Sequence, residues 1–258
     1  MRYDKKFKQL TALQEEVNNL KSENQRLYDS SESMREILNN TLHEVRRFSA
    51  QVSKFAERLS RETADQPLIN QTALSVFYTA GMISSRLAYT DIELNPRALE
   101  NQTPVRSGIY KKFDKAKRIL AEEAKCRRVT VNLVGESRAE IDALPVFELL
   151  PFVLVENGIK YSPENQRVDV FFEPNGAKQV VTVKSIGPSV TADELPRLFE
   201  KGVRGVSTLK MPGEGLGLFL AKRVCDYHGI RIKAERGALN LYSLNGIDYS
   251  EFKVVLQF

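Results

Sequence analysis

An apolar heptad repeat dominates the first part of this 258-residue chain. Within its seven-residue frame, the first position holds Leu10, Val17, Leu38, Val45, Val52 and Leu59, and the fourth holds Leu13, Leu20, Leu27, Met34, Phe48 and Phe55. Polar residues interrupt these positions at Asn24, Ser31, Thr41 and Glu62, and a lone Asn at the first position is tolerated because it helps to set the register. We therefore predict one helix over about residues 5–61, whose apolar seam needs a partner chain to cover it.

A second apolar-periodic stretch follows after a short break. Gln66 and Pro67 interrupt the first helix, and the second stretch covers residues 68–94 before Asn95 and Pro96 end it, because proline disfavours a helical residue before it. Two helices joined by a short turn make a hairpin, and hairpins from two chains make a four-helix bundle. Residues 1–95 are therefore predicted to form a coiled coil and a dimeric helical hairpin.

The remainder of the chain mixes helical and strand patterns. Residues 96–108 are rich in Asn, Gln, Thr, Pro and Gly, which indicates a linker. Beyond them, the periodicity predicts helices over residues 110–125, 146–161 and 217–227, and strands over 129–134, 168–173, 179–185, 231–235, 239–244 and 252–258. The predicted fold class is α+β, with the helical hairpin followed over residues 109–258 by an α/β sandwich that has helices on one face of a mixed sheet.

The composition argues against several classes of protein. The net charge is +5, but the Lys and Arg residues are scattered among acids, so nucleic-acid binding is not expected. No apolar run approaches the roughly 20 residues that span a bilayer, and the first ten residues lack the apolar core of a secretory signal. We therefore expect a soluble, cytoplasmic protein. Cys126 and Cys225 have no Cys or His partners at metal-binding spacing and are expected to be reduced thiols.

Two segments indicate ATP binding. Residues 152–163 read FVLVENGIKYSP, which places Asn157 one helical turn before Lys160 and Tyr161, so a metal ligand and a phosphate-binding cation share one helix face. Residues 213–218 read GEGLGL and open a second helix, where a glycine-rich backbone offers N–H groups to phosphates. Each segment supplies half of a nucleotide site, although neither a Walker loop nor the protein-kinase motif set occurs.

Together with three further motifs, these segments resemble the sensor histidine kinases, whose ATP-binding domain also occurs in gyrase, the large heat-shock chaperone and the mismatch-repair protein MutL. The motifs are a phosphoacceptor box at residues 42–47, an N box at 156–162, a first glycine box at 185–188, an F box at 198–205 and a second glycine box at 213–218. Five motifs in the family's order are a strong signal, whereas GxGLGL alone would be weak.

The resemblance implies ATP and Mg²⁺ as ligands and suggests a role for each site residue. Asn157 would coordinate the Mg²⁺ ion, Lys160 and Arg204 would place positive charge near the phosphates, and Tyr161 would pack or bond near the nucleotide. The remaining candidates for nucleotide binding are the glycine-box residues Ser185, Gly187, Gly213, Gly215, Leu216 and Gly217. Residues 206–212 would form a lid over the nucleotide.

His43 is the predicted phosphoryl acceptor. The heptad register places it at the sixth position, facing water, and Glu44 beside it could orient or deprotonate the ring. An isolated histidine is more often a plain surface residue, but the resemblance reverses these odds. The only other histidine, His228, follows a predicted helix and looks like a C-terminal residue stabilised by the helix dipole.

The implied activity is that of a cytoplasmic, homodimeric, ATP-dependent histidine kinase. It would phosphorylate His43 and pass the phosphoryl group to an aspartate of a separate response-regulator receiver, with an upstream sensor protein as a further candidate partner. The alternative is a weakly catalytic or non-catalytic ATP-responsive dimeric switch that signals to a bound partner by changing conformation. A serine kinase is a lesser possibility, because that class lacks the histidine hairpin.

Several residues depart from the family pattern. Ser185 stands where the family usually has an aspartate that binds the adenine amino group, Ser189 stands at a usual glycine, and Val153 replaces a frequent polar residue on the metal side. A serine lacks the charge that makes such hydrogen bonds about twice as strong, so adenine selectivity and the rate of ATP use come into question. Arg47 and Phe48 replace a polar residue and a proline after His43, which predicts absent or weak phosphatase activity toward a receiver.

Overall fold

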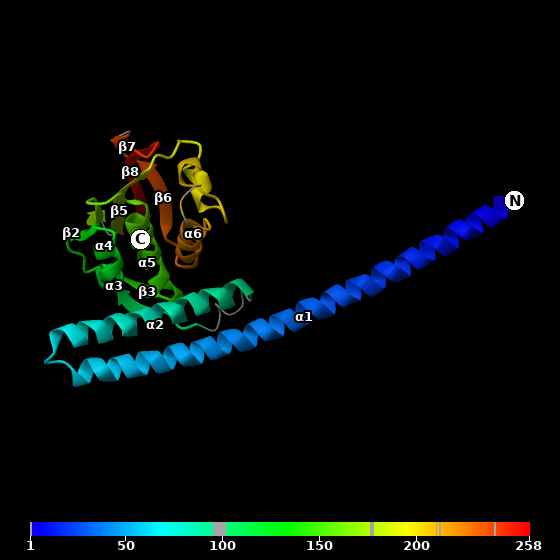
Figure 1. Cartoon of the computed structure of the whole chain (residues 1–258), viewed down its shortest axis with the longest axis horizontal. Coiled ribbons are helices and arrows are strands. Elements are labelled where there is room, and N and C mark those ends of the chain that lie inside the picture. Colours follow the sequence, from blue (N-terminus) through cyan, green and yellow to red (C-terminus); the bar gives the residue numbers. More distant parts are fainter. Residues whose placement is uncertain (1, 95–101, 176–177, 210, 212, 240) are drawn as a thin grey trace. The chain divides into compact units, whose positions relative to one another are not determined.

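The computed structural model describes residues 2–94, 102–175, 178–209, 211, 213–239 and 241–258 (Figure 1). Its elements, with η marking 3₁₀-helices, are α1 (Arg2–Glu62), α2 (Pro67–Leu94), β1 (Val105–Gly108), α3 (Ile109–Ile119), α4 (Ala121–Cys126), β2 (Thr130–Val134), β3 (Glu140–Ala143), η2 (Pro145–Glu148), α5 (Leu149–Tyr161), β4 (Arg167–Asn175), β5 (Lys178–Pro188), η3 (Pro196–Phe199), η4 (Val206–Thr208), α6 (Gly217–Tyr227), β6 (Arg231–Arg236), β7 (Tyr242–Leu244) and β8 (Ile247–Gln257). The chain divides into two compact units, residues up to Ser49 and Ala50–Phe258, which are described separately.

Helix α1 confirms the predicted long helix. Its heptad seam is open to solvent in the single chain, with exposed fractions of 58% for Leu20, 66% for Leu27 and 65% for Met34. Covering apolar surface of this kind contributes about 25 cal/mol for each Å² removed from water. A regularly spaced, uncovered apolar stripe therefore supports the predicted pairing of α1 with a second chain.

A tight turn joins α1 to α2 within the second unit. The Thr63 hydroxyl donates a hydrogen bond to the Leu59 carbonyl at 2.8 Å, and the Asn70 side chain donates one to the Ser60 carbonyl at 2.6 Å. Helix α2 then begins at Pro67, where the missing N–H costs nothing because the first helical N–H groups have no partner in the helix. The predicted hairpin is confirmed.

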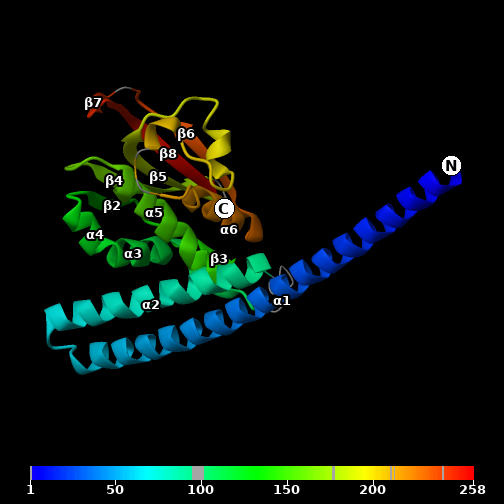
Figure 2. The ribbon, with the colours of Figure 1, turned by 45° about the vertical axis from the view of Figure 1, so that its right-hand side comes forward.

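Helix α2 packs against the α/β domain that follows it. It contacts η2, α3 and α5, and its Met82 and Ile92 side chains are buried in the same core as those helices. Figures 1 and 2 show α2 running along this domain. The predicted division into residues 1–95, 96–108 and 109–258 stays a prediction about functional parts, because α2 shares its core with the third of them.

The sheet is mixed, as predicted. Its strand order is β2-β4-β5-β8-β6, with β7 paired to β8; β2 and β4 run parallel, and the other neighbours run antiparallel. Alternate residues such as Val168 and Val170 on β4 and Val181 and Val183 on β5 are buried beneath α3, α5 and α6. Figure 2 shows these helices gathered on one face of the sheet, which confirms the α+β fold class.

Some elements differ from the predicted ones. The helix predicted over residues 110–125 breaks at Leu120 into α3 and α4, and the one predicted over 146–161 begins with the 3₁₀-helix η2 at Pro145. Strands β1 and β3 were not predicted, and β1 lies in the stretch assigned to the linker. They have four residues each and pair antiparallel with each other. Strands of this length are too short to show a periodic pattern in the sequence. They form because they pair with each other, which the sequence pattern does not reveal.

Candidate functional site

A cavity of about 370 Å³ opens in the second unit between α5, the first turn of α6 and the inner face of the sheet. Sequence motifs far apart in the chain supply its walls. The predicted nucleotide-binding residues all line it, namely Asn157, Lys160, Tyr161, Ser185, Gly187, Arg204, Gly213, Gly215, Leu216 and Gly217. The fold therefore brings together every residue that the motifs suggested for nucleotide binding.

Helix α5 points its polar residues into the cavity because its other faces are buried. Val155 and Ile159 are fully buried in the core, which turns Asn157, Lys160 and Tyr161 toward the cavity. The Asn157 amide makes no hydrogen bond within the described part of the chain, so its oxygen is free to ligate a metal ion. An amide oxygen that faces the cavity fits Mg²⁺, which takes protein oxygen ligands together with phosphates and water.

The glycine run brings the backbone of α6 close to that amide. A Cβ atom added at Gly217 would lie 2.7 Å from Asn157 Nδ2, and one at Gly215, where φ is +70°, would lie 2.7 Å from the Val203 carbonyl oxygen. Larger residues therefore do not fit at these two positions. No side chain caps α6, so the N–H groups of its first turn remain available to an anion.

Lys160 supplies positive charge beside the same loop. A Cβ atom added at Gly213 would lie 2.8 Å from Lys160 Nζ, which places the ammonium group against the glycine run. The ammonium also lies 5.3 Å from the centre of the Tyr161 ring. No carboxylate within the described residues pairs with Lys160, so the charge is available to a phosphate.

Arg204 lines the cavity but has protein partners. Its Nη2 atom donates hydrogen bonds to the backbone carbonyls of Thr208 and Met211, the second at 2.6 Å, and its Nε is buried without a partner among the described residues. Arg204 thus holds the segment predicted to be the lid, of which Lys210 and Pro212 lie outside the described residues. In this conformation Nε and both N–H groups of Nη1 have no hydrogen-bond partner among the described residues.

The departures from the family pattern lie in the same cavity or beside it. Ser185 is 9% exposed and sits opposite Phe252 in the sheet, while Val153 is buried in the cavity wall. Ser189 has a structural role instead. Its hydroxyl lies 2.5 Å from that of Ser250, and its N–H donates to the Asp248 carbonyl at 2.7 Å. Only Ser185 and Val153 therefore change what the cavity offers a ligand.

Besides Glu214 of the glycine run, two charged residues at the cavity were given no role by the sequence. Glu156 lines it, and burial is the main cause that raises the pKa of its carboxyl group, with Glu123 adding to the rise and Lys160 and Arg86 opposing it. Arg86 reaches the cavity from α2. Glu156 could have been identified as the neighbour of Asn157, whereas no sequence signal connects Arg86 to the ATP motifs.

His43 and Glu44 belong to the other compact unit, on α1. Both side chains are exposed, as the heptad register predicted. Arg47 places its guanidinium carbon 5.3 Å from the centre of the Phe48 ring, a cation–π contact. An exposed imidazole on a helix surface is sterically open to a phosphoryl donor.

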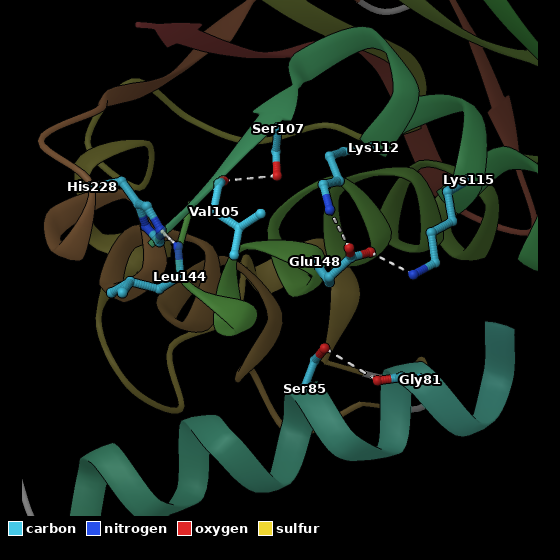
Figure 3. A network of polar contacts seen from close by, with 9 residues as sticks. All are labelled: Gly81, Ser85, Val105, Ser107, Lys112, Lys115, Leu144, Glu148 and His228. Atoms are coloured by element: carbon cyan, nitrogen blue, oxygen red, sulfur yellow. Dashed lines mark hydrogen bonds and ion pairs between the residues drawn. The ribbon is translucent and has the colours of Figure 1, made fainter. Parts of the chain in front are cut away.

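His228 differs from His43 in every respect that matters for phosphorylation. It follows α6 as predicted, but its ring is neutral: Nδ1–H donates to the Val224 carbonyl at 2.7 Å, and Nε2 accepts from the Leu144 N–H at 3.0 Å (Figure 3). Burial lowers the pKa of this ring. Both nitrogens are occupied, so of the chain's two histidines only His43 is exposed and has ring nitrogens without a partner among the described residues.

None of the helices in the described ranges is both long and apolar enough to cross a membrane.

Comparison with known proteins agrees with the motifs. Residues 149–248 match the family described as histidine kinase-, DNA gyrase B- and HSP90-like ATPase. The chain is 32% identical over 121 residues to the sensor protein QseC of Escherichia coli O157:H7, a match that covers 45% of this chain and 25% of QseC. It is 35% identical over 85 residues to the signal transduction histidine-protein kinase/phosphatase MprB of Mycobacterium ulcerans, covering 32% of this chain and 16% of MprB.

A solved structure titled mycobacterial sensor histidine kinase MprB is similar, with a TM-score of 0.48, 18% identity, and coverage of 60% of this chain and 97% of the other. The chain matches a quarter or less of the length of QseC and MprB. The resemblance to sensor histidine kinases is confirmed by the names of these relatives. The match to the histidine kinase-, DNA gyrase B- and HSP90-like ATPase family covers residues 149–248, the part of the chain that holds the N box, both glycine boxes and the F box.

Proposed function

We propose that this chain is a protein histidine kinase that transfers the γ-phosphoryl group of ATP to His43. The observation that carries the proposal is the single cavity lined by all the candidate nucleotide-binding residues, in a chain whose one exposed histidine is His43. In the transfer, the bond between the γ-phosphorus and its bridging oxygen breaks, and a bond from the phosphorus to an imidazole nitrogen forms. ADP leaves, and the ring gives up its N–H proton.

The chain's own groups would bind and orient the triphosphate. Lys160 and the free N–H groups at the start of α6 would bind phosphate oxygens, and the Asn157 amide would hold Mg²⁺. When bound, that ion would neutralise part of the phosphate charge. Arg204 would hold the lid segment closed over the nucleotide through the carbonyls of Thr208 and Met211.

On α1, Glu44 would orient the His43 ring or take its proton, so that the opposite nitrogen can attack. The exposed heptad seam supports a homodimer in which α1 pairs with its copy. The phosphoryl group would then pass to an aspartate of a separate response-regulator receiver. An upstream sensor protein and a cytoplasmic location belong to the same proposal. The side chains of Arg47 and Phe48, which pack on each other, carry no amide or hydroxyl group that could position a water. We therefore expect little phosphatase activity toward the receiver.

Incubation of the purified chain with Mg²⁺ and γ-labelled ATP tests the proposal. We expect a protein-bound label that is lost in acid and retained in base, as for a phosphorus–nitrogen bond. His43→Gln should abolish it. Glu36→Gln is the matched control, since Glu36 is also exposed and occupies the same heptad position one heptad earlier. Label that survives in His43→Gln would exclude His43 as the acceptor.

A second candidate function is an ATP-responsive dimeric switch with little or no catalysis. Two cavity residues favour it: Ser185 offers the adenine a neutral hydroxyl, and the buried Val153 offers the metal side no polar group. Nucleotide binding without any label on the chain would support the switch and sink the kinase proposal.

A further inference from the structure

Arg86 has an unusual position for a residue of the helical hairpin. It belongs to α2, yet it lines the cavity formed by the ATP-binding motifs. Its side chain is exposed, and its guanidinium makes no hydrogen bond or ion pair with the residues that the structure describes. An unpaired guanidinium at the mouth of a cavity is suited to an anionic ligand, because its N–H donors match phosphate geometry.

The contacts that α2 makes with the α/β domain hold Arg86 at the cavity. Ile92 is 1% exposed within the shared core. The next residue, Glu93, accepts hydrogen bonds at its Oε1 atom from Arg223 Nε at 3.1 Å, from Arg223 Nη2 at 3.0 Å and from the Tyr227 hydroxyl at 2.9 Å. Burial and Glu93 together raise the pKa of the nearby Tyr89 to about 12, which keeps its hydroxyl protonated.

A second set of contacts holds the other end of the same stretch. Lys115 of α3 lies 5.5 Å from the centre of the Tyr78 ring, and its ammonium pairs with Glu148 at 2.9 Å (Figure 3). Lys112 pairs with the same carboxylate. Burial raises the pKa of Glu148, but these two cations together hold it below its usual value. Contacts at Tyr78 and at Glu93 thus flank Arg86 on both sides along α2.

The surroundings of Arg86 also indicate which part of a nucleotide it would meet. Its positive charge opposes the rise that burial causes in the pKa of the carboxyl group of Glu156, the residue before Asn157 on α5. Asn157 in turn touches Gly217 at the start of α6. This end of the cavity holds the free N–H groups and Lys160, whereas Ser185 lies on the sheet. Arg86 therefore belongs to the phosphate end.

We propose that Arg86 is a nucleotide-binding residue supplied by the hairpin, which contacts the polyphosphate of ATP while α2 is packed on the ATP domain. The inference rests on ATP binding in this cavity, as proposed above. Since coupling is reciprocal, a docked α2 then strengthens ATP binding, and bound ATP strengthens the docking of α2 by the same factor. ATP binding would in this way change how firmly α2 docks, even when no phosphoryl group is transferred.

Binding of ATP, ADP and adenosine to the full chain and to Arg86→Gln, measured by calorimetry, tests the proposal. We expect about a threefold to tenfold loss for ATP, a smaller loss for ADP and no change for adenosine, because only the phosphates meet Arg86. Arg86→Lys should restore part of the loss. The control Arg231→Gln removes an equal charge from an exposed residue of β6 outside the cavity and should bind as the original chain does.

Equal ATP affinity of Arg86→Gln and the original chain would overturn the proposal, and so would an equal loss for adenosine. If the original chain itself binds no ATP, the proposed function fails instead, so the two failures are distinguishable. Glu93→Ala provides the second measurement. It should lower ATP affinity by releasing α2, and Arg86→Gln combined with it should cost no more than the larger single loss.

Hydrogen exchange supplies a measurement that would not change if Arg86 had only a structural role. Bound ATP should slow exchange of the α2 amides between Met82 and Glu93 in the original chain but not in Arg86→Gln. Equal slowing in both proteins would mean that ATP reaches α2 by another route and would count against Arg86.

Discussion

Helices α1 and α5 both carry candidate catalytic or binding residues, but different surroundings position them. Val155 and Ile159 of α5 are fully buried, so the core of one chain decides where Asn157 points. His43 lies on α1, where seam residues such as Leu27 stay exposed in the single chain. The comparison teaches that a single chain can build the whole cavity, whereas the apolar seam of α1 stays uncovered until a second molecule packs on it.

The largest effect is expected from a cavity made beneath α5. Leu150→Ala removes a fully buried side chain and should lower the free energy of unfolding by about 2–5 kcal/mol. Chemical denaturation checks this at two protein concentrations. The loss should be the same at both, because the contacts lie within one chain. A loss that depends on concentration would contradict the contrast drawn between the two helices.

A seam substitution should behave in the opposite way. Leu27→Ala removes a side chain that is exposed in the single chain and buried in the predicted dimer, at a cost of roughly 2 kcal/mol of association free energy. Sedimentation should show more monomer at low concentration. Glu36→Ala, at a solvent-facing heptad position of the same helix, is the control and should leave the dimer unchanged. If Leu27→Ala associates as strongly as the original chain, the seam does not hold the dimer together.

A smaller effect is expected where α6 meets α5. Gly217→Ala adds a Cβ atom 2.7 Å from Asn157 Nδ2, which must displace the amide and should lower ATP affinity about tenfold, or about 1.4 kcal/mol. Gly81→Ala in α2 is the matched control, because its Cβ meets nothing closer than Lys115 Nζ at 3.9 Å. That change should raise stability by about 0.5–1 kcal/mol and leave ATP affinity as it is.

The smallest effect concerns pH. His228 binds the Leu144 N–H only when neutral, and burial lowers its pKa in the folded chain below the unfolded value of about 6.5. This contribution is present above about pH 6.5 and is lost as the pH falls through the lower folded value, because the unfolded chain binds the proton more readily. Unfolding free energies should therefore fall more steeply below pH 6.5 in the original chain than in His228→Gln. Parallel curves would show that His228 is not responsible.

Local patterns predicted the long elements well and the short ones poorly. Helix α6 spans the predicted residues 217–227, and α1 extends the predicted 5–61 by a few residues at its start and one at its end. Strands β1 and β3 escaped prediction because four residues carry no readable period, and their pairing depends on residues far apart in the chain. The split at Leu120 was missed for a similar reason, since both α3 and α4 are helical on their own.

The sequence by itself determined the seam of α1, the solvent-facing position of His43 and the set of residues around the cavity, because each depends on a period or on a short motif. Only the tertiary structure decided how Arg204 is bonded, why His228 is neutral and that Arg86 reaches the cavity. These last features depend on contacts between residues far apart along the chain. Packing chooses such contacts from many possible ones, and no local pattern records the choice.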